Sequence, residues 1–97
     1  MISDETVVRR NPSVESRGLG EEGGAVLLHV GTGAYHGTND VGALIWEILE
    51  EPKSFGTLLA RLRDQLEETP PTLAEEIAEF LDELAERELV LLEPQTS

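Results

Sequence analysis

The sequence predicts an α+β fold, a small three-stranded antiparallel sheet followed by three helices. In the first part of the chain, short apolar runs alternate with glycine-rich turns such as "GEEGG" (20–24) and "GTG" (31–33). From residue 39 onward the apolar residues recur with the period of a helix, and prolines divide this part into three segments. This order of elements is close to a winged helix-turn-helix with its wing at the front.

The clearest strand is expected over residues 25–30 ("AVLLHV"), a β-rich apolar run with glycines on both sides. After a hairpin turn, residues 34–37 are expected to form the last strand of the meander, at an edge of the sheet. Residues 13–19 are a weaker first strand. Residues 1–12 are expected to be a flexible tail or an edge strand, and residues 93–97 a C-terminal tail. No repeat or linker divides residues 13–92, which are expected to form one domain.

Three helices are expected in the second part of the chain. Asn39 is a suitable N-cap for the first, and Ser54, after the break at Pro52, for the second. Thr72 and Glu75 have the spacing of a capping box at the start of the third. Residues 88–94 are expected to leave that helix as an extended segment. The side chains expected to face inward from the third helix are Leu73, Ile77, Phe80, Leu81 and Leu84.

The chain is strongly acidic, with a net charge of −13. Residues 1–37 hold five acidic and three basic residues (net −2), and residues 38–97 hold fifteen and four (net −11). A protein with this much negative charge repels phosphates, so nucleic acid is not expected as a partner. A winged-helix DNA-binding protein stays a less favoured alternative, because the second helix offers Arg61, Arg63 and Gln65.

No membrane segment is expected, because the apolar runs are too short to span a bilayer. The first residues lack the basic and apolar regions of a signal peptide, so we expect a cytoplasmic location.

No catalytic, metal or cofactor site is expected, and the protein is not expected to be an enzyme. The chain has no cysteine, which excludes thiolate chemistry. His29 and His36 have no carboxylate at ligand spacing, so we interpret both as ordinary strand histidines. The serines lack the context of a catalytic nucleophile.

Two features fit either ordinary packing or a binding groove. Tyr35 either closes the sheet core or lies on an edge strand that a peptide can extend. On the third helix, small residues flank the large apolar ones, with acids just beyond. This arrangement is either a plain helix flank or a shallow trough whose acidic lip suits a basic peptide residue. The small residues are Ala74, Ala78 and Ala85, and the acids are Glu75 and Asp82.

The chain also resembles a known family. The stretch "VLLHVGTGAYHGTNDVGALIWEILEE" (26–51), with "SFGTLLARL" (54–62) and "EEIAEFLDELAERELV" (75–90), is similar to the PqqD-like peptide-recognition domains. The most similar members are the stand-alone proteins of lasso-peptide biosynthesis. Three residues depart from the family's pattern: Thr38 where an aliphatic residue is common, His36 where a second aromatic is frequent, and Glu88 where glycine is usual. The matching positions are Val26-Leu27-Leu28, Thr32-Gly33, Tyr35-His36, Asn39, Gly42 and Ile45-Trp46.

The resemblance implies a non-catalytic adaptor without a cofactor, which binds the leader segment of a ribosomally synthesised lasso-peptide precursor and presents it to a leader peptidase. The leader would add as a strand along the third strand, against the third helix, while Trp46 locks the first helix to the fold. The implied partners are the precursor leader, a cysteine-type leader peptidase and a lasso cyclase. An adaptor for another enzyme that modifies such peptides is the alternative.

The expected peptide-binding residues follow from this placement. On the strand they are Ala34, Tyr35, His36 and Gly37. On the third helix they are Ala74, Glu75, Ile77, Ala78, Leu81, Asp82 and Ala85, with Glu75 and Asp82 as contacts for a basic leader residue. A bulky residue at position 78 would then block leader capture.

Overall fold

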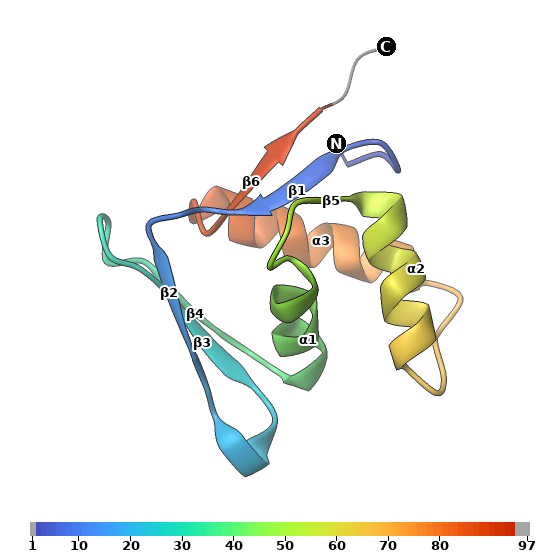
Figure 1. Ribbon diagram of the computed structural model, residues 1–97, viewed down its shortest axis with the longest axis horizontal. Coiled ribbons are helices and arrows are strands. Elements are labelled where there is room, and N and C mark those ends of the chain that lie inside the picture. Colours follow the sequence, from blue (N-terminus) through green and yellow to red (C-terminus); the bar gives the residue numbers. More distant parts are fainter. Residues whose placement is uncertain (1, 95–97) are drawn as a thin grey trace.

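The computed structural model describes residues 2–94, which form three α-helices and six strands. In chain order the elements are β1 (Val7–Arg10), β2 (Val14–Gly18), the short 3-10 helix η1 (Gly20–Glu22), β3 (Ala25–His29), β4 (Tyr35–Thr38), α1 (Asp40–Ile48), β5 (Lys53–Ser54), α2 (Phe55–Gln65), α3 (Leu73–Glu86) and β6 (Val90–Glu93). The strands make two antiparallel sheets, β2-β3-β4 and β5-β1-β6. The first lies to one side of the helices and the second across their top (Figure 1). The expected α+β class is confirmed, with a second sheet in addition.

The sheet β2-β3-β4 is the meander expected from the sequence. Ala25, Leu27 and His29 of β3 point inward and are buried, whereas Leu28, opposite Tyr35 of β4, is exposed. This alternation is that of a sheet with one face on the core. Among residues 2–94, β4 pairs only with β3, so it is an edge strand, as expected.

The second sheet differs from the expectation of a tail or an edge strand over residues 1–12. β1 is its middle strand, between β5 and β6, and Val8 is fully buried. Its strands come from the start, the middle and the end of the chain (Figure 1). Pairing between such distant segments, one of them two residues long, leaves no periodic signal in the sequence. The expected tail at 93–97 begins inside β6 with Glu93, and residues 95–97, like residue 1, lie outside the described residues.

Two of the three expected helix caps are formed. Asn39 Oδ1 accepts from the N–H of Gly42 at 2.9 Å, and Ser54 Oγ accepts from the N–H of Thr57 at 3.2 Å. α3 starts directly after Thr72, as expected, but the predicted capping box is wrong. Thr72 has a turn conformation (φ −92°, ψ 10°) instead of the extended one typical of a capping residue, and its side chain accepts no hydrogen bond from the helix.

One apolar core joins the three helices to both sheets. Trp46 of α1 is buried in it, and the Arg10 guanidinium of β1 lies 4.8 Å from the centre of the indole ring. Arg10 Nε also donates to the Trp46 carbonyl at 3.0 Å, so one side chain fixes β1 to α1. None of the helices in the described part of the chain is long and apolar enough to cross a lipid bilayer. The fully buried large side chains include Val8, Leu27, Ile45, Leu49, Leu58, Leu62, Leu81, Leu84, Leu89 and Val90.

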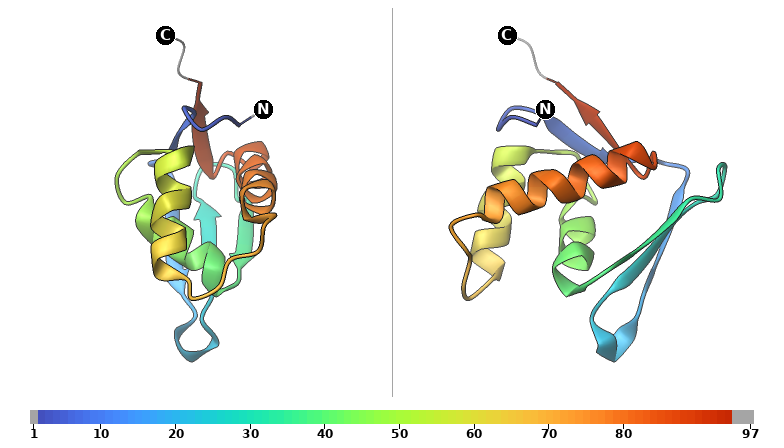
Figure 2. Two further views of the ribbon diagram at one scale, coloured as in Figure 1. Left: turned by 90° about the vertical axis from the view of Figure 1, so that its right-hand side faces the viewer. Right: turned by 180° about the vertical axis from the view of Figure 1, so that it is seen from behind.

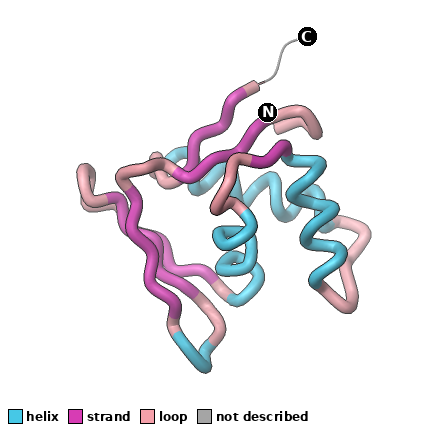
Figure 3. The backbone as a smooth tube through the Cα atoms, in the orientation of Figure 1, coloured by secondary structure: helices cyan, strands magenta, loops and turns pink. Residues whose placement is uncertain are grey.

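Asn11, between β1 and β2, connects the two sheets to the end of α3. Its Nδ2 donates to the Glu88 carbonyl at 2.7 Å and lies 3.3 Å from Nε2 of His29 in β3. On the other side of its ring, His29 Nδ1 accepts from the backbone N–H groups of Gly31 and Thr32. His29 is therefore a structural residue of the β3–β4 hairpin, as expected. Figure 3 shows the chain turning from one sheet into the other at this junction.

α3 ends in a Schellman motif, in which the Glu88 N–H donates to the Ala85 carbonyl at 3.0 Å and the Leu89 N–H to the Leu84 carbonyl at 2.9 Å. The motif requires a left-handed residue at Glu88, whose φ is 59°. A side chain is strained in this conformation, which glycine adopts freely.

Replacing Val8 by alanine is expected to lower the free energy of unfolding by about 2 kcal/mol, because two buried methyl groups leave a cavity in the core. Val30→Ala is the matched control. Val30 is 57% exposed, so its effect is expected to stay within about 0.5 kcal/mol. Urea denaturation measures both. Equal small effects would mean that β1 is frayed in solution.

Glu88→Gly is expected to raise the free energy of unfolding by roughly 0.5–1 kcal/mol, since glycine removes the left-handed strain. Glu86→Gly, inside the last turn of α3, is the control and is expected to cost about 1 kcal/mol. Thermal denaturation of the two variants shows whether each substitution raises or lowers the stability. A loss of stability in Glu88→Gly would contradict the strain argument.

Candidate functional site

The open edge of β4 is the first component of the site. The Ala34 carbonyl accepts from the His29 N–H at 2.8 Å, on the side of β3. Because alternate residues of an antiparallel strand turn their backbone groups to opposite neighbours, Tyr35 and Gly37 direct their N–H and C=O groups to the open side. A Cβ atom placed on Gly37 would meet nothing within 4 Å, so the outer face of β4 is open at this residue. β4 can therefore accept an added strand.

One flank of α3 lies beside this edge. The His36 ring of β4 packs edge-to-face on Phe80 of α3, with ring centres 5.8 Å apart and planes at 64°. Arg87, the residue that directly follows α3, donates to His36 Nδ1. Phe80 and Arg87 are seven residues apart, two turns of the helix, and so lie on the same side. Seen from behind, α3 crosses the molecule next to β4 (Figure 2).

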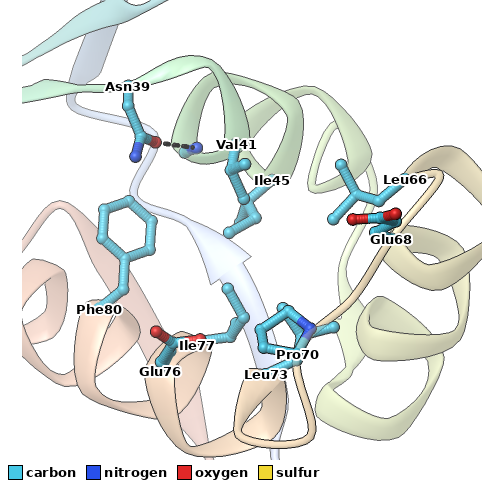
Figure 4. A pocket seen from close by; sticks show the side chains of 11 residues that line it. Asn39, Val41, Ile45, Leu66, Glu68, Pro70, Leu73, Glu76, Ile77 and Phe80 are labelled. Carbon is cyan, nitrogen blue, oxygen red and sulfur yellow. Dashed lines mark hydrogen bonds between the residues drawn. The ribbon is translucent and has the colours of Figure 1, made fainter.

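An apolar pocket of about 360 Å³ opens where β4 leads into α1. It lies between α1, the α2–α3 loop and α3, and Glu68 and Glu76 extend from opposite sides of it (Figure 4). Gly42 sets its shape, because a Cβ atom there would come within 2.6 Å of Thr38 Cβ and 3.1 Å of Phe80 Cζ. The apolar side chains that line the pocket are Val41, Ile45, Leu66, Pro70, Leu73, Ile77 and Phe80.

A shallow hollow of about 600 Å³ continues the site along β4 toward the β3–β4 hairpin. It is lined by residues 33–37 and by Arg87. The contact between His36 and Phe80 lies between the hollow and the pocket. We call the whole feature, from Arg87 past His36 and Phe80 to the apolar pocket, the β4 groove.

The four expected strand residues all line the β4 groove, and so does Ile77. The other expected helix residues do not. Leu81 is fully buried in the core. Ala78 and Asp82 are each two residues from Phe80, which places them about 200° around the helix from it, on the side away from β4. The three alanines pack against the core, and the two acids are exposed. The structure thus brings together β4 and the Phe80 flank, and not β4 and the flank of Ala74, Glu75, Ala78, Asp82 and Ala85.

Tyr35 does not close the sheet core. Its side chain is 70% exposed on the outer face, opposite the groove side taken by His36. Its contribution to the groove is therefore its backbone. Thr38, at the position where the family pattern is aliphatic, accepts from the Ala25 N–H at 3.2 Å and donates to the Asn39 carbonyl. No group of three or more potential metal ligands gathers within residues 2–94.

Sequence reasoning missed Phe80, Arg87 and the groove residues of α1 and the α2–α3 loop. Phe80 was expected to be an inward core residue, but it is only half-buried and leaves one face to the pocket. Arg87 carries no distinctive pattern at all. The α1 and α2–α3 loop residues enter the site only because the fold brings them to the end of β4.

His36 is the titratable group at the centre of the groove. Burial lowers the pKa of His36 below its usual value, Arg87 lowers it further, and Glu83 partly opposes both. The folded state therefore favours the neutral ring, which accepts the hydrogen bond from Arg87. Because the unfolded chain binds the proton more readily, this residue's contribution to stability declines as the pH falls through about 6.5, the unfolded value.

Arg87→Gln is expected to raise the pKa of His36, because the variant removes a neighbouring positive charge. Glu83→Gln is expected to lower it, because the variant removes the negative charge that opposes the shift. NMR titration of the His36 ring protons measures both. Shifts in the same direction would contradict the opposite effects of these two charges on the ring.

The chain matches the family model of coenzyme PQQ synthesis protein D (PqqD) over residues 24–90. These residues include β3, β4 and the three helices, and therefore the whole β4 groove. No curated protein matches the chain at a significant level. Among solved structures, TbiB1 in complex with the TbiA(beta) leader peptide is similar, with a TM-score of 0.72 and 31% sequence identity over 92% of this chain and 99% of that one. TbiB1 was solved with a bound peptide, and the two similarities together support the expectation that this chain is a binding protein and not an enzyme. We conclude that this chain belongs to the PqqD family and has its fold.

Proposed function

We propose that this protein is a cytoplasmic adaptor that captures the leader of a lasso-type precursor peptide in the β4 groove and presents it to a cysteine-type leader peptidase, and through it to a lasso cyclase. The observation that carries the proposal is the open edge of β4 in line with an apolar pocket. The similarity to TbiB1, solved with a leader peptide, supports the same kind of ligand.

Two kinds of interaction would hold the leader. Its backbone would pair with the outward N–H and C=O groups of Tyr35 and Gly37, at about 0.5–1.5 kcal/mol per hydrogen bond. A large apolar side chain would fill the pocket floored by Ile77, which stabilises the complex by roughly 1.5–3 kcal/mol. Together with further contacts along α3, these terms must offset the ordering of a flexible peptide.

Presentation to an enzyme requires that the bound leader stays accessible. A leader added to β4 would itself be the new edge of the sheet, and its alternate side chains would join the outer face. That face already exposes Tyr35 and Leu28, whereas the groove side is covered by α3. A bound leader is therefore open to a second protein on its outer face.

The groove itself does not determine which enzyme receives the bound leader. An adaptor for another enzyme that modifies ribosomally synthesised peptides would use the same groove. Binding to a panel of leaders from several peptide classes distinguishes these two functions. DNA binding gains no support, because the exposed side of α3 carries Glu75, Glu79, Asp82 and Glu86.

Fluorescence anisotropy of labelled lasso-type leaders, with the TbiA(beta) leader among them, tests the capture. Phe80→Ala is expected to weaken binding about tenfold, equal to 1.4 kcal/mol, because it removes a pocket wall. Gly37→Pro is expected to weaken it further, since proline removes an outward N–H and crowds the edge. Ala78→Phe lies on the other flank of α3 and is the matched control, with binding within twofold of wild type.

Circular dichroism confirms that each variant is folded. Loss of binding in Ala78→Phe but not in Phe80→Ala would move the groove to the alanine flank. Failure of the wild-type protein to bind any leader of the panel would contradict the proposed function. Two leader analogues N-methylated at alternate residues test strand addition itself, because only one of them should lose binding.

A further inference from the structure

Arg87 has an unusual environment for a cation in this chain. It is exposed at the C-terminal end of α3, it lines the hollow beside β4, and its guanidinium donates to the neutral ring of His36. The guanidinium has five N–H donors in a planar fork that matches a carboxylate. The hydrogen bond to His36 engages one of the two terminal nitrogens, in a residue that lines the hollow.

No carboxylate of the described residues lies within ion-pair distance of Arg87, although the chain has 20 acids and only 7 Lys and Arg residues. The ion pairs between described residues are Arg9–Glu93 and Lys53–Glu51. Glu83 lies one turn before Arg87, the arrangement that favours a pair along a helix, yet Arg87 turns toward β4 instead.

The helix dipole alone does not account for this direction. A cation near the end of a helix interacts favourably with the helix dipole wherever its side chain points. The contact with His36 instead holds Arg87 over the edge where a peptide strand would pass. The other end of the groove has the opposite charge, with Glu68 and Glu76 at the pocket.

We infer that Arg87 is a specificity-determining residue, which selects leaders that carry an Asp or Glu side chain where the peptide passes the β3–β4 hairpin. The inference rests on the proposed function. The leader carboxylate takes the free side of the guanidinium fork while His36 holds the other. The acids at the pocket end disfavour the same side chain there, so the pair of opposite charges fixes the register of the leader along β4.

Selection from a library of random peptides displayed on mRNA tests this inference without knowledge of the natural precursor. Wild-type protein, Arg87→Glu and the matched control Arg63→Glu, an exposed arginine on α2, are used as baits. Wild type and Arg63→Glu are expected to enrich Asp or Glu at one fixed position relative to an apolar residue. Arg87→Glu is expected to enrich Lys or Arg at that position.

A double-mutant cycle then measures the contact directly. Replacing the enriched acid by its amide in one selected peptide is expected to weaken binding to wild type about tenfold and to leave binding to Arg87→Gln unchanged. Two results would overturn this inference and leave the proposed function standing. One is enrichment of the same acid by Arg87→Glu, and the other is selected peptides that lose binding to Phe80→Ala but carry no acid at a fixed position. If no peptide is enriched, or if the selected peptides bind Phe80→Ala as tightly as wild type, both the inference and the proposed function fail.

Discussion

The hydrogen bonds of Asn11 are the interaction on which the geometry of the site depends. This side chain holds the carbonyl that follows α3 and contacts His29 of β3. Its backbone N–H donates to the Leu89 carbonyl at 3.1 Å. Because His29 in turn orders the hairpin that leads to β4, Asn11 sets the distance between the end of α3 and the edge of β4. Both walls of the groove are thus fixed by one residue between the two sheets.

The second sheet, β5-β1-β6, supports the groove from outside it. β6 begins three residues after Arg87, and its pairing with β1 holds the last turn of α3 in place. β1 is also held to α1 through Arg10 and Trp46, and α1 forms the pocket at the other end of β4. The N-terminal strand therefore supports the groove at both ends without lining it. A peptide site on such a frame is preorganised, which lowers the ordering cost on the side of the protein.

Local signals in the sequence were sufficient for much of the fold. The run at 25–30 and the caps Asn39 and Ser54 depend on neighbours within a few residues, and the structure has them where they were expected. The two-residue β5 and the central place of β1 depend on distant partners, and no local pattern carries that information.

On α3, too, local signals in the sequence were not sufficient to identify the residues that line the groove. Periodicity identifies the buried stripe of α3, but it does not say which of the two flanks of that stripe turns toward β4. The small size of Ala74, Ala78 and Ala85 favoured one flank, whereas Phe80 and Arg87 lie on the other. The pairing of β6 with β1 and the contacts of Asn11 determine which flank faces β4. Both are tertiary interactions between distant parts of the chain.

An edge strand that is open to a peptide is also open to a second copy of the same protein. Several features of this chain act against that pairing. β4 is only four residues long, and Arg87 lies beside its open edge. Two copies would each bring a net charge of −13, most of it in the helical part of the chain, and like charges of this size repel at close approach. A short peptide does not carry this charge. The acidity of the protein therefore disfavours pairing between two copies more than it disfavours pairing with a short peptide.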